Sequence, residues 1–199
     1  MLGTAARIAL VPLIGALIGC GLSAGPELRM VGDPRTSANA AIDDFPYDSP
    51  LTEGSIMLCL SQPATATIVS VALNNPNGQP TGDILVTGFA VRPNPFFTGH
   101  QFVGDARQLL ATVGGGFDPS AAQEVSGVCP ADIRTASDDV QSMTSELAVE
   151  VTWSSGDYAG GRDLAVTYDI GGTRRTAMVP FGIWLCAAKC PDGLGLDQT

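Results

Sequence analysis

Two cysteines near the end of the sequence have a spacing that could support metal or redox chemistry. Three residues separate Cys186 from Cys190, and Pro191 follows directly. A pair of thiolates could bind Cu(I), because soft sulfur ligands favour that ion. The same pair could instead form a structural disulfide in an oxidising compartment.

The Cys-x-x-x-Cys-Pro motif resembles that of membrane-tethered copper chaperones of the thioredoxin type. In that family the motif lies near the start of the domain, between a strand and a helix, and a ligand histidine follows it. Here the motif ends the chain, and the single histidine, His100, precedes it. We therefore favour a structural disulfide. An envelope copper or redox carrier that uses Cys186 and Cys190 is the alternative function.

Apart from Cys20, which is discussed below, the chain contains an even set of four cysteines. Cys59 and Cys129 complete this set. Four cysteines allow three disulfide connectivities, and the sequence does not choose among them. We expect two disulfides, with a preference for Cys59 or Cys129 as a partner of a C-terminal cysteine.

Residues for nucleophilic or acid–base catalysis are sparse. His100 would need an activated serine and an orienting carboxylate, and no Gly-x-Ser-x-Gly elbow follows a predicted strand. Glycoside hydrolysis needs two carboxylates that face each other across about 5 to 9.5 Å. Glu146 and Glu150 share one strand face, but we expect that face to be exposed to solvent. The sequence therefore predicts a non-enzymatic protein without a cofactor or a metal site, and a hydrolase is the third interpretation.

One proline-bounded segment concentrates aromatic side chains. Phe96 and Phe97 follow two prolines, and His100 and Phe102 come shortly after them. If these side chains are exposed, they form an interaction patch. If they fill one end of the domain, they belong to its core, and we favour that arrangement.

The chain that carries these residues has the composition of an all-β protein. It contains 24 glycines and 14 prolines, and few of its residues are charged. Residues 146–153 and 163–170 alternate between apolar and polar side chains, which is typical of half-buried antiparallel strands. Gly171 and Gly172 predict a two-residue hairpin loop, so that paired residue numbers sum to 343. This register places Leu164 opposite Val179, Val166 opposite Ala177, Thr167 opposite Thr176 and Asp169 opposite Arg174.

Further strands are predicted on both sides of an irregular region. They lie at 55–61, at 66–73 with Thr67, Val69, Val71 and Leu73 on one face, at 84–91, and at 179–186, where Pro180 and Gly182 suggest an edge or a bulge. Residues 94–145 are the least regular, with a strand expected at 109–113. Either a short helix lies near 130–134 or the region is an excursion held by Cys129. We predict an immunoglobulin-like antiparallel β-sandwich of about seven strands at residues 53–199, without the Cys and Trp spacing of true immunoglobulin domains.

The first residues have the pattern of an export signal. Arg7 is followed by the apolar run 8–18, which is too short to span a bilayer. The run ends in Leu17-Ile18-Gly19-Cys20, which resembles the lipobox of bacterial lipoproteins. The resemblance implies that residues 1–19 are a signal peptide and that Cys20 receives lipid and becomes the first mature residue. The alternative is an ordinary secretory signal that is cut later, which would give a secreted protein.

Residues 20–52 are small, polar or proline, without a sustained period. We expect them to form a flexible tether between the lipid and the domain. The chain has 20 acidic residues against 10 basic ones and a formal net charge of −10. Such a surface repels phosphates, which argues against nucleic-acid binding.

The domain loosely resembles uncharacterised exported lipoproteins of high-GC Gram-positive bacteria. The resemblance lies in the strand Leu58-Cys59-Leu60, in the strand that ends Leu185-Cys186, and in the Tyr168 hairpin. It implies no activity. We expect a lipid-anchored extracytoplasmic module on the outer face of the cell membrane, which binds another envelope protein or a small ligand without catalysis.

Overall fold

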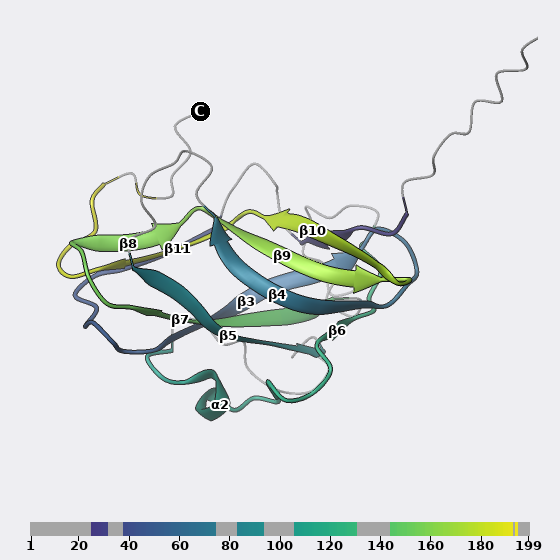
Figure 1. Ribbon diagram of the computed structural model, residues 1–199, viewed down its shortest axis with the longest axis horizontal. Helices are drawn as coiled ribbons and strands as arrows, with labels where there is room; N and C mark the ends of the chain where they lie inside the picture. The colour runs from purple at the N-terminus through teal and green to yellow at the C-terminus, as the bar shows by residue number, and fades with distance from the viewer. Residues whose placement is uncertain are drawn as a thin grey trace, which may run out of the picture.

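The computed structural model describes residues 25–31, 38–74, 83–93, 106–130, 144–192 and 194. These residues form strands and one short helix (Figure 1). The strands are β1 (Leu28–Met30), β2 (Ala38–Ile42), β3 (Leu51–Leu60), β4 (Ala66–Asn74), β5 (Ile84–Pro93), β6 (Glu124–Val125), β7 (Ser145–Trp153), β8 (Tyr158–Gly161), β9 (Asp163–Ile170), β10 (Thr173–Val179) and β11 (Phe181–Cys186). The helix is α2 (Leu110–Val113).

Two four-stranded sheets form an all-β sandwich. Their strand orders are β1-β3-β7-β5 and β10-β9-β4-β6. Immunoglobulin constant-type domains have sheets with the orders A-B-E-D and G-F-C. Seven of the strands can be lettered A to G in chain order, namely β1, β3, β4, β5, β7, β9 and β10. The first sheet then has the order A-B-E-D, and the second has the order G-F-C followed by β6. The predicted immunoglobulin-like sandwich is therefore confirmed, and β2, β6, β8 and β11 are additions to its seven strands.

A third sheet, with the order β2-β11-β8, extends the sandwich. β11 pairs with β2 in parallel and with β8 in antiparallel orientation. The sequence predicted one strand over 179–186, but β10 ends at Val179 and β11 begins at Phe181. Proline has no backbone N–H to donate to a ladder, so Pro180 is where the chain passes from one sheet to another.

The core lies between the two four-stranded sheets. On β7 the alternate residues Leu147, Val149, Val151 and Trp153 are buried, as the period of two predicts. On β9 the buried alternate residues are Leu164, Val166, Tyr168 and Ile170. Both sets belong to one apolar cluster.

The hairpin of β9 and β10 has the predicted register. Asp169 lies opposite Arg174, and every paired sum from Thr173 and Ile170 onward is 343. Gly171 and Gly172 both have positive φ, at 55° and 77°, as a two-residue loop of the type I′ class requires. Arg174 donates from both Nε and Nη2 to the carboxylate of Asp169 at 2.9 Å.

The prediction that one face of β4 alternates without interruption from Thr67 to Leu73 is wrong. Tyr168 is paired with Ile68 and Thr167 with Ser70, so Val69 is an extra residue in a β-bulge. The bulge shifts the alternation by one residue. Ile68 and Val71 are therefore buried, whereas Val69 is 40% exposed.

The expectation of a flexible tether over 20–52 is wrong for the described residues 25–31 and 38–52. Leu28 in β1 lies opposite Leu60 in β3, and its N–H donates to the Tyr168 hydroxyl. Ile42 and Phe45 are buried in the core. These short segments pair with β3 and β11, which would otherwise be open sheet edges. The folded domain therefore includes residues before 53.

Candidate functional site

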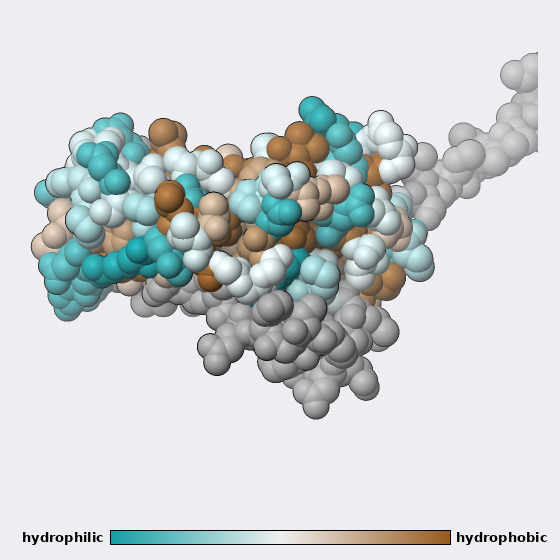
Figure 2. All heavy atoms as spheres, turned by 90° about the horizontal axis from the view of Figure 1, so that it is seen from below, coloured by the Kyte–Doolittle hydropathy of each residue, from teal (hydrophilic) through white to brown (hydrophobic). Residues whose placement is uncertain are grey.

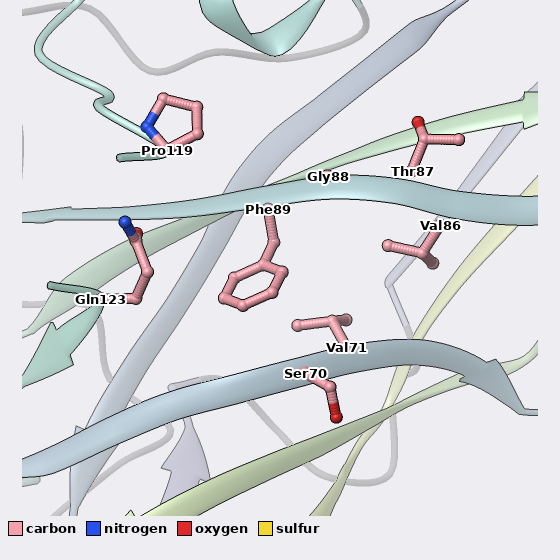
Figure 3. A pocket seen from close by; sticks show the side chains of 8 residues that line it. All are labelled: Ser70, Val71, Val86, Thr87, Gly88, Phe89, Pro119 and Gln123. Carbon is pink, nitrogen blue, oxygen red and sulfur yellow. The ribbon is translucent and has the colours of Figure 1, made fainter. Parts of the chain in front are cut away.

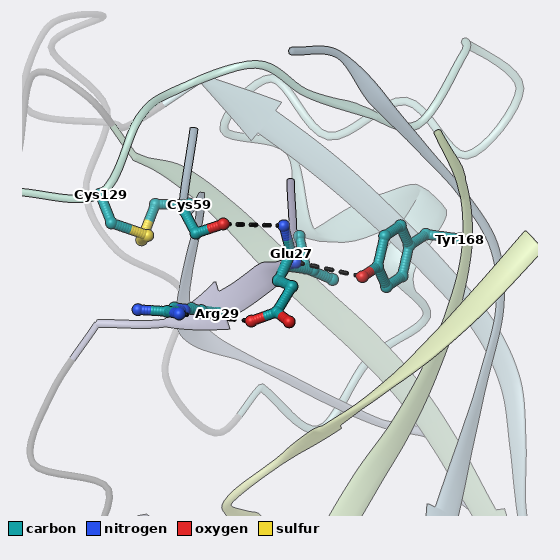
Figure 4. Close-up of a disulfide and its surroundings, with 7 residues drawn as sticks. Glu27, Arg29, Cys59, Cys129 and Tyr168 are labelled. Atoms are coloured by element: carbon teal, nitrogen blue, oxygen red, sulfur yellow. Dashed lines mark hydrogen bonds and ion pairs between the residues drawn. A yellow bond between two sulfur atoms is a disulfide. The ribbon is translucent and has the colours of Figure 1, made fainter. Parts of the chain in front are cut away.

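The four cysteines form two disulfides, Cys59–Cys129 and Cys186–Cys190. The preferred pairing between the middle and the C-terminal cysteines is wrong. Cys129 N–H donates to the carbonyl of Leu60, and Leu60 forms a parallel bridge with Val128. This pairing brings Cys129 beside Cys59 on the outer part of β3, next to β1 (Figure 4). The excursion that leads to Cys129 is thus held to the sandwich, as one of the two alternatives predicted.

The Cys186–Cys190 disulfide closes a short loop after β11 that holds the end of the described chain against the turn after β2. Cys186 is buried, and its carbonyl accepts a hydrogen bond from Phe45 N–H. Cys190 N–H donates to Asp43 Oδ1 at 2.7 Å, and Asp44 N–H donates to Ala188 O. These contacts favour a structural role for the pair.

Several predicted site residues lie outside the part of the chain that the structure describes. They are Cys20, Phe96, Phe97, His100 and Phe102. In the described residues, no His, Cys, Asp or Glu side chains form a group of three or more that could hold a metal ion. The same residues contain no helix that is long and apolar enough to cross a membrane.

The expectation that Glu146 faces solvent is wrong. Its side chain is fully buried on the outer face of the β1-β3-β7-β5 sheet, where it forms an ion pair with Arg92 on β5. Arg92 Nε donates to Glu146 Oε2 at 2.7 Å. The β3 bulge places Ser55 in the left-handed region, at φ 61°, from where its N–H donates to Glu146 Oε1.

Residues 106–125, here called the cover segment, bury this ion pair. Phe117 of the segment lies under the Arg92 guanidinium, 4.3 Å from its carbon to the ring centroid. Arg92 Nη1 also donates to Gly115 O. Glu150 contacts the segment directly, since Leu110 N–H donates to its Oε2 at 2.7 Å. The cover segment is therefore attached to the sheet by Glu150 and by Arg92, which is in turn paired with Glu146.

The cover segment contains a helix where a strand was predicted. Leu110–Val113 form α2, and Leu110 packs with Ala90, Phe117 and Ala148 in a second, smaller apolar cluster. The sequence LLATV is short enough to suit either element. The three glycines after it, Gly114–Gly116, all have positive φ and end the helix.

An open groove lies where an edge of one sheet faces an edge of the other. It has a volume of about 430 Å³ and a mainly apolar lining (Figure 3). Its walls come from β4, β5 and the cover segment. The lining residues are Ser70, Val71, Val86, Thr87, Gly88, Phe89, Pro119 and Gln123.

Gln123 closes one end of this groove. Its backbone carbonyl accepts a hydrogen bond from Ile68 N–H on β4, and its side-chain Oε1 accepts one from Val91 N–H on β5. Its Nε2 donates to the carbonyls of Asp118 and Ala121. Gln123 thus joins the two sheet edges at this end, while both edges continue beyond it along the groove.

The walls of the groove are open sheet edges within the described part of the chain. β5 is the last strand of its sheet and pairs with β7 on one side. β4 pairs with β6 at Ala66 and Thr67, and beyond these residues it pairs with β9 alone. Each edge therefore presents backbone N–H and C=O groups without a strand partner.

Three acidic residues adjoin the groove-lining segments in the sequence. Asp83 precedes β5, Asp118 precedes Pro119, and Glu124 follows Gln123. Hydrogen bonds from Ser120, through its side chain and its backbone N–H, lower the pKa of Asp118 below its usual value. The described segments that line the groove contain two bases, neither of which is a lining residue. Arg92 is buried on the outer sheet face, and Arg107 donates to Asp43 O and lies over the Phe45 ring.

Large apolar side chains are also exposed elsewhere, but they are dispersed over the described surface. The face in Figure 2 shows hydrophobic residues in small groups among hydrophilic ones. Such single exposures are normal for soluble domains. The largest exposed fractions are those of Leu85 at 66%, Met178 at 51%, Leu109 at 50% and Tyr47 at 46%.

Sequence reasoning predicted the two strands that form the groove but not the groove itself. The facing of β4 and β5 depends on long-range sheet order, and the role of Gln123 depends on a turn with no regular period. The bulge at Val69 had no local signal either. Searches with this chain find no matching family model, no matching curated protein and no matching solved structure.

Proposed function

We propose that this chain is a lipid-anchored extracytoplasmic β-sandwich, which serves as a non-catalytic binding module at the outer face of the cell membrane. Two disulfides in one small domain are the observation that carries the proposal, because such bonds persist in oxidising compartments. The lipobox-like Leu17-Ile18-Gly19-Cys20 supplies a route to that compartment and a site for the anchor.

The groove between β4 and β5 supports a binding role. It combines an apolar lining with open backbone groups, which suits recognition of a ligand or a protein segment. Of the carboxylates that could have suggested hydrolysis, Glu146 is instead paired with Arg92 inside the fold, and Glu150 attaches the cover segment to the sheet. The alternative, a copper or redox carrier, would require the Cys186–Cys190 disulfide to be opened.

Replacement of Cys20 by Ser tests the anchor. In a bacterial host that processes lipoproteins, the parent chain should fractionate with the membrane. Cys20→Ser should appear in the medium or accumulate as an unprocessed precursor. Ser23→Ala is the matched control, because it changes a nearby small residue and leaves the thiol in place. Equal membrane retention of Cys20→Ser and the parent would refute lipidation.

A further inference from the structure

We propose that the groove binds an extended peptide segment, which adds as a strand to the free edge of β5 and inserts an apolar side chain between β4 and β5, with Lys or Arg at its alternate positions. This inference rests on the proposed binding role and names the class of partner. It joins three independent features of the groove: its backbone edge, its apolar lining and its acidic surroundings.

The backbone of β5 is oriented for strand addition. Val91 N–H donates to Gln123 Oε1, so it points away from β7 and toward the free edge. Alternate residues of an antiparallel strand direct their N–H and C=O groups to the same side. Phe89, two residues before Val91, therefore presents its backbone N–H and C=O at the free edge, beside the groove.

Gln123 already occupies the position that one residue of such a partner strand would take. Its side-chain carbonyl accepts the Val91 N–H at 2.5 Å, where the backbone carbonyl of a neighbouring strand would lie. Gln123 replaces a partner strand at this single position only, because its Nε2 donates to the carbonyls of Asp118 and Ala121 within its own turn. In the described part of the chain, the edge from Ile84 to Phe89 has no strand partner, and it offers a reach of about 20 Å at about 3.3 Å per residue. A longer segment would have to follow the β-bulge at Thr87.

The two β5 side chains that line the groove from the core side share one face because a β-bulge at Thr87 shifts the alternation between them. Val86 and Phe89 pack against the core from this wall, and buried Val71 on β4 forms the other. A strand added to β5 would direct every second side chain toward this gap. Those side chains must be apolar, while the intervening ones face solvent, and the acidic residues Asp83, Asp118 and Glu124 adjoin the lining segments.

The charge of the chain favours an unrelated peptide over a second copy of this chain as the occupant of the groove. Two copies, each with a formal net charge of −10, would repel each other. A segment with Lys or Arg at its outward positions would instead be attracted to the acidic surroundings of the groove. The peptide also satisfies the open edge of β5, which a small apolar ligand would leave without hydrogen-bond partners.

The test uses the full chain, purified with its disulfides intact from whichever fraction contains it. The binding measurement therefore does not depend on whether the chain is anchored to the membrane, so the two proposals can be refuted separately. The probe is the fluorescein-labelled peptide Lys-Val-Lys-Val-Lys-Val-Lys with an amidated C-terminus, and the measurement is fluorescence anisotropy. We expect saturable binding, and at least about tenfold weaker binding when Glu replaces every Lys. Failure to bind at about 1 mM, or tighter binding of the Glu peptide, would overturn the proposal.

Backbone methylation distinguishes strand addition from simple apolar binding. One peptide carries N-methyl groups on its valines and the other on its inner lysines. Because alternate N–H groups point to opposite edges, one of the two should lose at least about tenfold in affinity and the other much less. Equal losses, or no loss in either peptide, would contradict strand addition.

Two tryptophan variants locate the site on the protein. Ser70→Trp places a large side chain at the exposed wall of the groove and should weaken probe binding at least about tenfold. Met178→Trp changes an exposed residue of β10, outside the groove lining, and should leave binding unchanged. Circular dichroism verifies that each variant is folded. Equal binding by a folded Ser70→Trp variant would overturn the assignment.

Discussion

Arg92 and Glu146 lie directly opposite each other on β5 and β7, and their ion pair is buried outside the central core of the sandwich. The side-chain exposures are 1% and 0%, because the cover segment lies over this face of the sheet. An immunoglobulin-like sheet whose outer face is covered in this way has apolar packing on both faces. The groove then depends on the same cover segment, since Pro119 and Gln123 belong to it.

Loss of one partner of this ion pair should destabilise the domain strongly. Arg92→Met leaves the Glu146 carboxylate buried without its guanidinium, which typically costs about 3–5 kcal/mol in the free energy of unfolding. The double variant Arg92→Met with Glu146→Leu removes both charges and should recover much of that loss. Urea denaturation measures both.

Arg29→Met is the matched control for the buried pair. Arg29 forms an exposed ion pair with Glu27, with side-chain exposures of 53% and 47%. Surface pairs of this kind contribute about 0–1 kcal/mol, so the control should unfold near the parent midpoint. If the double variant loses as much stability as Arg92→Met and Glu146→Leu lose together when each is made alone, the buried pair does not act as a coupled unit.

The two disulfides should contribute unequally to stability. Cys59–Cys129 closes a loop with a sequence separation of 70, and Cys186–Cys190 one of 4. Chain-entropy arguments assign about 4 kcal/mol to the first and about 2 kcal/mol to the second. Replacing both cysteines of each pair by serine and comparing urea midpoints checks the ranking. A larger loss for the C-terminal pair would contradict it.

The hairpin register predicts a specific titration. Hydrogen bonds from the Arg174 side chain lower the pKa of Asp169 below its ordinary value near 3.8. The depressed pKa means that this interaction stabilises the folded state above pH 3.8 and is lost as the pH falls through the folded value. Arg174→Ala should raise the pKa of Asp169, measured by NMR of the side-chain carboxyl.

Arg175→Ala is the control for that titration, because Arg175 lies opposite Tyr168 and donates to Pro26 O. It should leave the pKa of Asp169 unchanged. An equal response of Asp169 to both alanine variants would contradict the observed register.

Gly160 should not tolerate a side chain. A Cβ atom there would lie 2.2 Å from Ile183 O and 2.7 Å from the Trp184 ring. Gly160→Ala should therefore force β8 away from β11, and overpacking of this kind typically costs about 1–3 kcal/mol. Gly88→Ala is the control, because its Cβ would meet neighbours at 3.6 Å and beyond. Equal thermal midpoints for the two variants would contradict the close packing of β8 on β11.

The features that the sequence predicted correctly are local. The β9–β10 register follows from a period of two and from Gly171-Gly172, which are all within one short stretch. The errors concern contacts between distant segments. The outer face of β7 is buried by the cover segment, which lies about thirty residues earlier in the chain. Cys129 reaches Cys59 through a parallel bridge between Leu60 and Val128 that no local pattern announces.

The short strands at the start of the domain were missed for a related reason. β1 has three residues and β2 has five, too few for a period to be evident. Their structure depends on pairing with β3 and β11, which lie far along the chain. Composition alone indicated a tether at these positions, and tertiary pairing outweighed it.

The most direct test of a lipid-anchored, oxidised module is the intact mass of the protein after alkylation without reduction. We predict a membrane-extracted species that begins at Cys20, carries acyl chains there, and has Cys59, Cys129, Cys186 and Cys190 unalkylated. A species that retains residues 1–19 and carries alkyl groups on those four cysteines would contradict both the anchor and the oxidising compartment.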